Sequence, residues 1–487
     1  MSSNTNPDRN QPWREELRKE ISNKVRTNMP RVHMHELAPD YRNKNNEEVN
    51  SGLTLEDALN EAKRCLDCPS PTCTTGCPVG IDIPQFIKNM ERGEFLEAAK
   101  ILKQTSALPA VCSRVCPQEK QCETECIYAK KLGKESVAIG YLERFAADYE
   151  RESGQMSLPE CAPPNGIKVG VVGSGPAGLS FASDMAKRGY QVTVFEALHE
   201  IGGVLKYGIP EFRLPNSIID VEIETLKKIG VEIITNCIVG RTVTFEDLQA
   251  QGYKALFVGS GAGLPRFMNI PGENLIGVMS SNEYLTRINL MGASRAGDTP
   301  VLSGKNVAII GGGNTAMDAV RTAKRLGADH AMIVYRRSEA EMPARIEEIK
   351  HAKEEGVEFM PLHNPIEYIS DEKGRVKQMR LQKMQLGEPD ASGRRSPVEI
   401  PGAIETIEVD TVVVSIGVSP NPLIPSSIKG LDVSKWGTIT VNDGMQSSIP
   451  TIFAGGDIVR GGATVILAMG DGRKAAAAMD EYLQKNC

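Results

Sequence analysis

Length, composition and charge restrict the protein to a few classes. Its 487 residues are too many for one hydrophobic core and predict two or three domains. A net charge of −6 argues against a nucleic-acid or membrane partner. The sequence shows no run of roughly 20 apolar residues that would span a bilayer and no apolar secretory segment, so we expect a cytoplasmic protein.

Eight of the eleven cysteines lie close together near the N-terminus. They form the runs C-x2-C-x4-C-x3-C-P, starting at Cys65, and C-x3-C-P-x4-C-x3-C, starting at Cys112. Short runs with a Cys-Pro pair are typical of ferredoxins, and thiolates suit iron. A zinc-bound docking module is the alternative, although zinc sites usually use two well-separated pairs. Cys161, Cys237 and Cys487 lie outside these runs.

The pattern around the cysteines predicts a small helical domain over residues 1–150. Residues 1 to about 50 favour an extended or partly helical arm. Apolar periodicity predicts helices over 55–64, 83–102 and 139–149. A linker rich in Pro and Gly, residues 152–166, then ends the domain.

A strand starting at Lys168 leads into the glycine motif Gly-Ser-Gly-Pro-Ala-Gly and then a helix. This order is typical of a dinucleotide site, because the glycines allow a tight turn, close approach of a pyrophosphate and close helix packing. The next strand, 192–195, ends in an acid that would hold ribose hydroxyls. We predict the first part of an FAD domain over 165–290, with contacts from Gly173, Ser174, Gly175, Pro176, Ala177, Gly178 and Glu196.

A second fingerprint, Gly311-x-Gly313-x-x-Ala316, follows the strand 306–310. The next strand of this unit ends in Arg336-Arg337 instead of an acid. Paired arginines would bind the 2′-phosphate of NADP through charge-assisted bonds. We therefore predict an NADPH domain over 291–417, with a β excursion between residues 360 and 408.

The C-terminal segment, 418–487, is expected to complete the FAD domain. A strand ends in Gly456-Asp457, and a helix opening near Thr464 would direct its positive end at the flavin. The predicted class is α/β, with two Rossmann-like dinucleotide-binding domains after a helical iron–sulfur domain. The flavin unit has no closely spaced cysteine pair, so we predict no catalytic side chain and an exit for electrons through the iron–sulfur domain.

Six stretches of the sequence together resemble one family. They are the two cysteine runs taken as one, GSGPAG at 173, YGIPEFRLP at 207, GGGNTAMD at 311, YRRSEAEMPAR at 335 and AGGDIVRGGATVILAMGDGRKAA at 454. The resemblance is to the small (β) subunit of glutamate synthase, a family of FAD- and NADPH-dependent reductases with two N-terminal 4Fe–4S clusters. The same module resembles the N-terminal half of dihydropyrimidine dehydrogenase and the large subunit of the ferredoxin-dependent NADP transhydrogenase.

The resemblance implies specific site residues. One cluster would use Cys65, Cys68, Cys73 and Cys126. The other would use Cys77, Cys116, Cys122 and Glu143, which stands where relatives have Gln or Glu; spacing alone leaves Cys112 open as the eighth ligand. FAD contacts would come from Gly203, Val204, Arg213, Gly456, Asp457, Thr464 and Val465. NADPH contacts would come from Gly311, Gly313, Asn314, Thr315, Arg336, Arg337 and Arg345.

The resemblance also implies a function. Hydride would pass from NADPH to FAD, and single electrons would then pass through the clusters to the large glutaminase/FMN subunit or another redox partner. The alternative is the large subunit of an electron-bifurcating transhydrogenase. The sequence alone does not separate these two partners.

Overall fold

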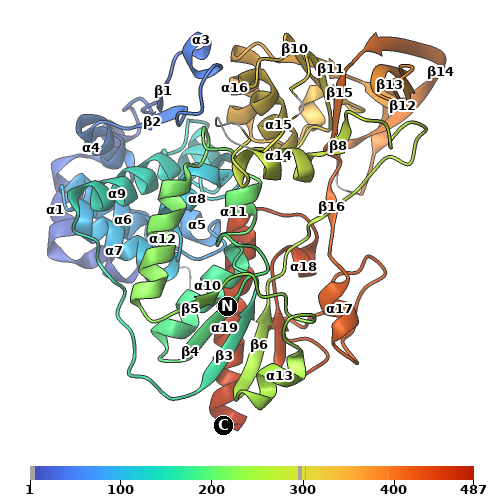
Figure 1. Ribbon diagram of the computed structural model, residues 1–487. Coiled ribbons are helices and arrows are strands. Elements are labelled where there is room, and N and C mark those ends of the chain that lie inside the picture. The colour runs from blue at the N-terminus through green and yellow to red at the C-terminus, as the bar shows by residue number, and fades with distance from the viewer. Residues whose placement is uncertain (1–5, 294–298, 302, 392, 487) are drawn as a thin grey trace.

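The computed structural model describes residues 6–293, 299–301, 303–391 and 393–486. Figure 1 shows a helical N-terminal region beside two α/β units, one below the other, with the C-terminal helix running through the lower unit. Cys487 lies outside the described residues. None of the described helices combines the length and the apolar run needed to cross a membrane.

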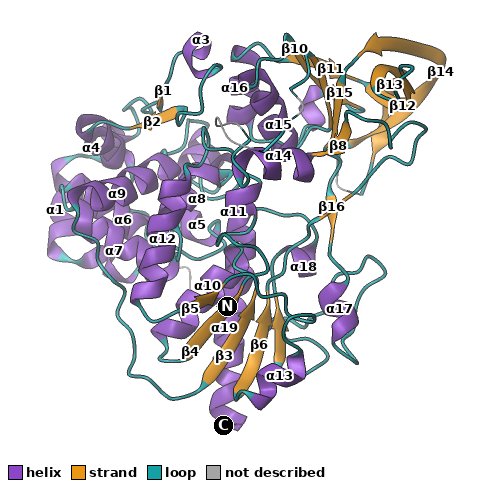
Figure 2. Ribbon diagram, in the orientation of Figure 1, coloured by secondary structure: helices purple, strands orange, loops and turns teal. Residues whose placement is uncertain are grey.

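The N-terminal region is almost entirely helical, as Figure 2 shows. The predicted helix at 55–64 is confirmed. The helix predicted over 83–102 is two helices, because the chain turns at Gly93 with a φ of +83°. The arm contains η1 (Pro7–Asn10), α1 (Pro12–Glu20), α2 (Asn23–Arg26), β1 (His35–Glu36), α3 (Pro39–Arg42) and β2 (Asn50–Gly52). The domain itself contains α4 (Leu55–Arg64), α5 (Thr72–Thr75), α6 (Ile83–Glu91), α7 (Phe95–Thr105), α8 (Pro109–Val115), η2 (Gln118–Lys120), η3 (Tyr128–Leu132) and α9 (Ile139–Ser153).

The first α/β unit has a five-stranded parallel sheet in the order β17-β6-β3-β4-β5. Its C-terminal strand joins the sheet beside β6, which confirms the predicted return of the chain. The strands are β3 (Lys168–Val172), β4 (Gln191–Phe195), β5 (Glu232–Ile234), β6 (Tyr253–Val258) and β17 (Ile452–Ala454). The helices are α10 (Pro176–Lys187), α11 (Val204–Tyr207), α12 (Asn216–Lys228), α13 (Phe245–Ala250), α17 (Leu423–Ser427), α18 (Asp457–Arg460) and α19 (Val465–Asn486).

The second unit has a parallel sheet in the order β11-β10-β9-β15-β8. Strand β8 pairs with β15, so residues 278–289 belong to this unit and the boundary expected at 290 is corrected. Its strands are β8 (Val278–Ser280), β9 (Asn306–Ile310), β10 (His330–Tyr335), β11 (Glu358–Pro361) and β15 (Thr411–Val414). Its helices are α14 (Ser281–Asn289), α15 (Asn314–Arg325), η4 (Glu339–Glu341) and α16 (Ile346–Glu354).

The predicted β excursion is confirmed as an antiparallel sheet of β12 (His363–Ser370), β13 (Val376–Pro389) and β14 (Arg395–Glu408). The two units are joined by paired crossing strands, β7 (Leu264–Pro265) and β16 (Val418–Ser419).

One hydrophobic core continues from the helical domain into the first α/β unit. It includes Phe86 and Leu102 on one side and Phe181 and Met469 on the other. The second unit has separate cores. The helical domain and the first unit therefore form one packed body, despite the linker between them.

Candidate dinucleotide and iron–sulfur sites

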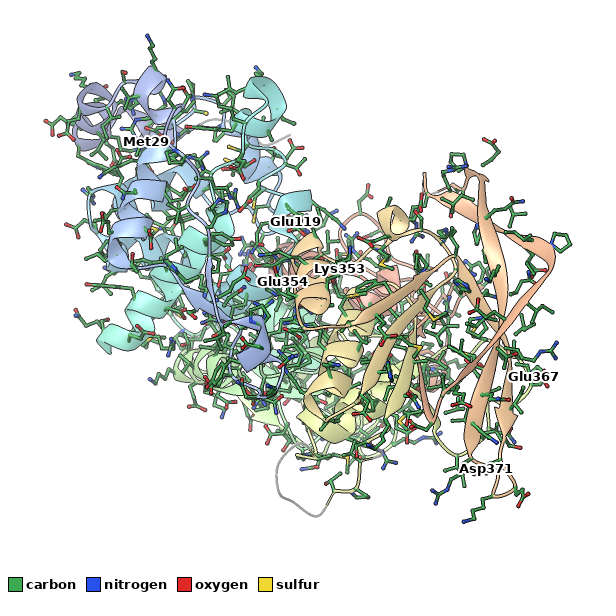
Figure 3. All side chains as sticks on the ribbon, turned by 90° about the horizontal axis from the view of Figure 1, so that it is seen from above. Met29, Glu119, Lys353, Glu354, Glu367 and Asp371 are labelled. Atoms are coloured by element: carbon green, nitrogen blue, oxygen red, sulfur yellow. The ribbon has the colours of Figure 1, made fainter. Side chains whose placement is uncertain are left out.

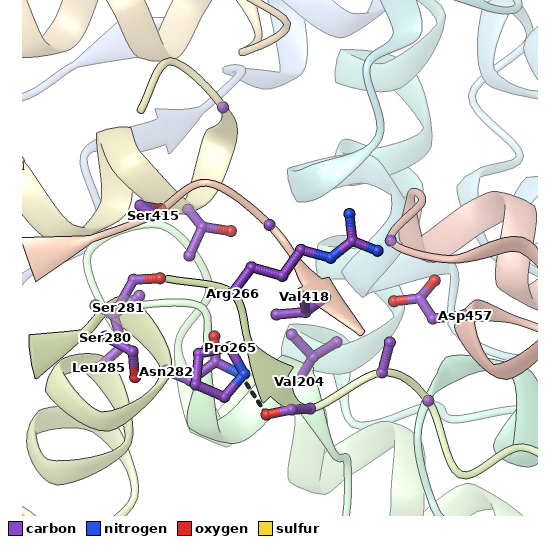
Figure 4. Close-up of a pocket in the computed structure, with 18 of the residues that line it drawn as sticks. Val204, Pro265, Arg266, Ser280, Ser281, Asn282, Leu285, Ser415, Val418 and Asp457 are labelled. Carbon is purple, nitrogen blue, oxygen red and sulfur yellow. Dashed lines mark hydrogen bonds between the residues drawn. The ribbon is translucent and has the colours of Figure 1, made fainter. Parts of the chain in front are cut away.

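A cavity of about 1960 Å³ lies between the two α/β sheets. Both glycine turns line it, as do the crossing strands. Figure 4 shows Val204, Arg266 and Asp457 extending into this space from different elements. Single small-molecule pockets have volumes of roughly 300–1,000 Å³, so the cavity is large enough for two ligands.

The first glycine turn delivers the N-terminus of α10 to the cavity. Among the described residues, no side chain caps this helix at Gly175, so its first backbone N–H groups remain available. A Cβ at Gly175 would meet no described atom within 4 Å, whereas one at Gly178 would lie 2.0 Å from the carbonyl oxygen of Gly173. The turn therefore fits a pyrophosphate, with Gly175 facing it and Gly178 packing the helix on the strand.

Glu196 lies at the end of β4, on the cavity wall. Its carboxylate accepts hydrogen bonds from the backbone N–H of Ser174 (2.8 Å), the Ser174 hydroxyl (2.6 Å) and the backbone N–H of Leu198 (2.8 Å). These bonds fix the orientation of the carboxylate. Ser174 itself is fully buried and supports Glu196 instead of lining the cavity.

The half of the cavity next to the first glycine turn is also lined by Gly203, Val204, Gly456, Asp457, Thr464 and Val465. Burial raises the pKa of Asp457 to about 6, and its carboxylate accepts a hydrogen bond from the backbone N–H of Ala463 (3.1 Å). Helix α19 begins at Val465, so its positive end faces the same space. These residues fit the hydroxyl-rich chain and ring of a flavin.

The second glycine turn lines the other half of the cavity with Gly311, Gly313, Asn314 and Thr315. Helix α15 starts here, and no described side chain caps its N-terminus at Gly313. Arg336 and Arg337 lie on the cavity wall at the end of β10. The predicted nicotinamide-nucleotide residues, except Arg345, are thus brought together around one helix N-terminus.

Arg345 is not among the residues that line the cavity, so its contact with NADPH stays a prediction. Its guanidinium donates to the carbonyl oxygen of Arg114 and to Gln118 Oε1, each at 3.0 Å, and pairs with Glu347 at 2.9 Å. Figure 3 shows Glu119 of the helical domain close to the helix that carries Lys353 and Glu354. Arg345 therefore docks the second unit on the helical domain.

Arg213 borders the cavity, but carboxylates of the second unit neutralise its charge. Its Nη1 lies 2.9 Å from Asp318 Oδ2, and its Nε lies 3.2 Å from Glu348 Oε1. Burial opposes ionisation of Glu348, yet the guanidinium groups of Arg213 and Arg321 lower its pKa to about 2. This network holds Arg213 at the cavity wall, and its contact with FAD stays a prediction.

Replacing Arg213 with alanine should lower stability by about 3–5 kcal/mol, because Asp318 would remain buried without its partner and Glu348 would keep only Arg321. The matched control is Arg287→Ala, which removes an exposed pair with Glu283 and should cost less than about 1 kcal/mol. Thermal unfolding of both variants checks this. Equal shifts in midpoint would show that the Arg213 network does not hold the two units together.

The first predicted cluster set surrounds a small cavity in the helical domain. Cys65, Cys68, Cys73 and Cys126 all line it, together with apolar side chains such as Ile87. Burial raises the pKa of Cys65 to about 12 and that of Cys73 well above its usual value. Buried thiolates need a positive partner, so this donor set fits a metal cluster.

The second predicted set gathers around Glu143. Burial, with a smaller contribution from the Glu143 carboxylate, raises the pKa of Cys77 to about 11. Burial, with smaller contributions from Glu123 and Glu143, raises the pKa of Cys122 well above its usual value. Cys116 is close to the same carboxylate. Glu143 Oε1 is buried and has no hydrogen-bond partner among the described residues, and burial raises the Glu143 pKa to about 8. An unpartnered buried carboxylate beside three thiols fits a cluster ligand.

The spacing of the thiols can be compared with that of a zinc site. Four sulfurs around one zinc ion, each about 2.3 Å from the metal, would lie about 3.8 Å apart. No three cysteines in the described part of the chain have sulfurs within 4.8 Å of one another. The wider spacing favours a multi-iron cluster.

Helix α8 connects the second set to the large cavity. Val115 lines that cavity, and the next residue, Cys116, belongs to the cysteine set. On the same helix, Cys112 Sγ donates to Met469 Sδ of α19 at 3.3 Å. A flavin in the cavity and a cluster at Cys116 would therefore be neighbours.

Sequence reasoning missed several cavity residues, notably Val115, Tyr207 and Arg266. Burial, with smaller contributions from Asp457 and Glu196, raises the pKa of Tyr207 to about 12. Arg266 follows crossing strand β7 and donates from Nε to the Ser419 hydroxyl at 2.8 Å. Arg266 belongs to no sequence motif, so no pattern in the sequence pointed to it.

Comparisons with known proteins agree with this geometry. Residues 42–155 match the 4Fe-4S domain II of dihydropyrimidine dehydrogenase, and residues 167–472 match the pyridine nucleotide-disulphide oxidoreductases. FprA from Mycobacterium tuberculosis in complex with NADPH is similar to 66% of this chain and 85% of its own, with a TM-score of 0.55 and 20% identity, which shows a shared fold.

Two curated relatives are similar to most of this chain, and the second of them shows the family. The NADP(+)-dependent formate dehydrogenase subunit beta of Moorella thermoacetica is 40% identical over 438 residues, which are 85% of this chain and 60% of that protein. This chain thus spans less than two thirds of that relative. The NADPH glutamate synthase small chain of Escherichia coli (strain K12) is 37% identical over 445 residues, 90% of this chain and 94% of that one. The chain therefore belongs to the glutamate synthase small-chain family, in which a 4Fe–4S domain precedes a pyridine nucleotide-disulphide oxidoreductase domain.

Proposed function

We propose that the protein is the NADPH-oxidising electron-transfer subunit of a glutamate synthase. The observation that carries this proposal is the junction at Val115 and Cys116, where the wall of the dinucleotide cavity continues into a cysteine set. When bound, FAD accepts hydride from NADPH and passes electrons one at a time to iron–sulfur clusters.

The chain's own residues would bind and orient these groups. The N-terminus of α10 and the Glu196 carboxylate would hold the pyrophosphate and ribose of FAD, and Asp457 would hold its hydroxyl chain. The N-terminus of α15 and Arg336 would hold NADPH. Two clusters would be held by the sets Cys65, Cys68, Cys73, Cys126 and Cys77, Cys116, Cys122, Glu143.

The relatives favour the glutamate synthase role over the transhydrogenase. Glutamate synthase small chains from several bacteria match about nine tenths of this chain. We infer that the electron acceptor is the large, glutamate-forming subunit, and that the complex works in the cytoplasm, where thiols stay reduced.

The test combines the purified holoprotein with a purified glutamate synthase large subunit under anaerobic conditions. NADPH should then drive glutamate formation, and a mixture without this chain should not. Reduction of an artificial acceptor by NADPH without any glutamate formation would contradict the assigned partner and leave the NADPH oxidation itself intact.

A further inference from the structure

The two arginines at the end of β10 have different surroundings. Arg336 is exposed on the cavity wall, whereas Arg337 is 7% exposed. Arg337 donates from Nη2 to Asp390 Oδ2 at 2.7 Å and from Nε to the carbonyl oxygen of Arg395 at 2.9 Å. Its guanidinium is therefore largely committed to these two partners and poorly placed to bind a phosphate as well.

Asp390 and Arg395 flank the turn between β13 and β14. The turn is closed by a hydrogen bond from the Asp390 backbone N–H to the Arg394 carbonyl oxygen (2.7 Å) and by one from Gly393 N–H to the Asp390 carbonyl oxygen (2.8 Å). Arg337 therefore ties the tip of this hairpin to the end of β10.

The hairpin brings a third arginine to the cavity. Arg394 is half-buried in the turn and lines the cavity, as do Arg336 and Arg337. Arg395, the next residue, is not among the residues that line the cavity and donates to the carbonyl oxygens of Leu386 (3.0 Å) and Gly387 (3.2 Å). Two residues that look alike in sequence thus have different environments.

We propose that Arg394, together with Arg336, binds the 2′-phosphate of NADPH, and that Arg337 and Asp390 are positioning residues that hold the hairpin against β10. This inference rests on the proposed use of NADPH. In a dinucleotide fold the ribose 2′ position lies at the end of the second strand, here β10. A phosphate with close to two negative charges favours guanidinium groups from two directions, each forming bidentate, charge-assisted bonds.

The test measures NADP⁺ and NAD⁺ affinity by calorimetry on the holoprotein, with the NADPH Michaelis constant as a second readout. Arg394→Ala and Arg336→Ala should each weaken NADP⁺ binding by about tenfold to hundredfold and leave NAD⁺ binding unchanged. Arg395→Ala removes the same charge from the same turn, so it is the matched control and should keep the wild-type ratio of affinities.

Asp390→Ala tests the positioning role. This substitution should also weaken NADP⁺ binding selectively, because the hairpin loses its contact with Arg337 at the end of β10. Asp390→Glu should restore part of the NADP⁺ affinity. If Arg337 bound the phosphate, removing Asp390 would release it and NADP⁺ would bind as well or better, which would overturn the proposal. An unchanged ratio in Arg394→Ala, or equal losses for both nucleotides, would overturn it too.

The two proposals fail in distinguishable ways. A wild-type protein without preference for NADP⁺ over NAD⁺ contradicts the proposed function. If the wild-type preference for NADP⁺ is lost in Arg336→Ala but kept in Arg394→Ala, the role of the hairpin is contradicted and the proposed function is not.

Discussion

Replacing Glu143 with alanine is expected to reduce the iron content of the purified protein from about eight to about four atoms per chain, because one of the two proposed 4Fe–4S clusters would lose its proposed fourth ligand. The carboxylate is buried beside Cys77, Cys116 and Cys122, and its Oε1 lacks a hydrogen-bond partner among the described residues. NADPH oxidation with an artificial acceptor should persist, whereas electron delivery to the partner should fall to background. Iron and sulfide analysis measures the first effect directly.

Two further variants make this result specific. Glu143→Gln keeps an oxygen donor and should retain more iron than the alanine variant. Cys112→Ala removes the other candidate for the eighth ligand, whose thiol lies beside both Cys116 and Met469, and should keep the full iron content if Glu143 is that ligand. Normal flavin content in all three variants would show that they fold. Loss of iron in Cys112→Ala but not in Glu143→Ala would reverse the assignment.

Replacing Gly178 with alanine is expected to remove most of the flavin. The added Cβ would lie 2.0 Å from the carbonyl oxygen of Gly173, so α10 must move away from β3 and carry its N–H groups out of place. We expect the flavin-bound protein to carry a strain of about 1–3 kcal/mol that the flavin-free protein can relieve. This strain would weaken flavin binding by about 5- to 150-fold. Flavin absorbance per chain after gel filtration measures the loss.

The second fingerprint supplies the control for this prediction. Ala316 stands at the position that corresponds to Gly178 and is fully buried, so that turn accommodates a methyl group. Ala316→Gly should keep the full flavin content and cost only about 1 kcal/mol of helix stability. Full flavin retention in Gly178→Ala would show that the close packing is not required for binding.

Local patterns predicted most of the fold. Each glycine turn follows a buried strand and opens a helix, so the elements around Gly175 and Gly313 could be identified before their contacts were known. Residues 278–289 were assigned to the wrong unit, since strand β8 has three residues and carries no fingerprint. Its sheet is determined by pairing with β15, more than a hundred residues later in the chain, and such pairing leaves little trace in a local window.

Charged site residues were harder to predict than glycines. Sequence position placed Arg213 and Arg345 near ligands, but long-range carboxylates and carbonyls hold both of them: Asp318 pairs with Arg213, and Gln118 with Arg345. An arginine is long and has five donors, so tertiary neighbours decide where it points. Arg394 reaches the cavity through a hairpin that no nucleotide motif includes.

The most direct test of the central claim is an anaerobic titration of the purified protein with NADPH, followed by visible absorption and electron paramagnetic resonance. We expect the flavin absorbance to fall and signals of reduced iron–sulfur clusters then to appear, in protein that contains about eight irons per chain. A protein that contains stoichiometric zinc and no iron, or flavin reduction with no cluster signal at any NADPH concentration, would contradict it.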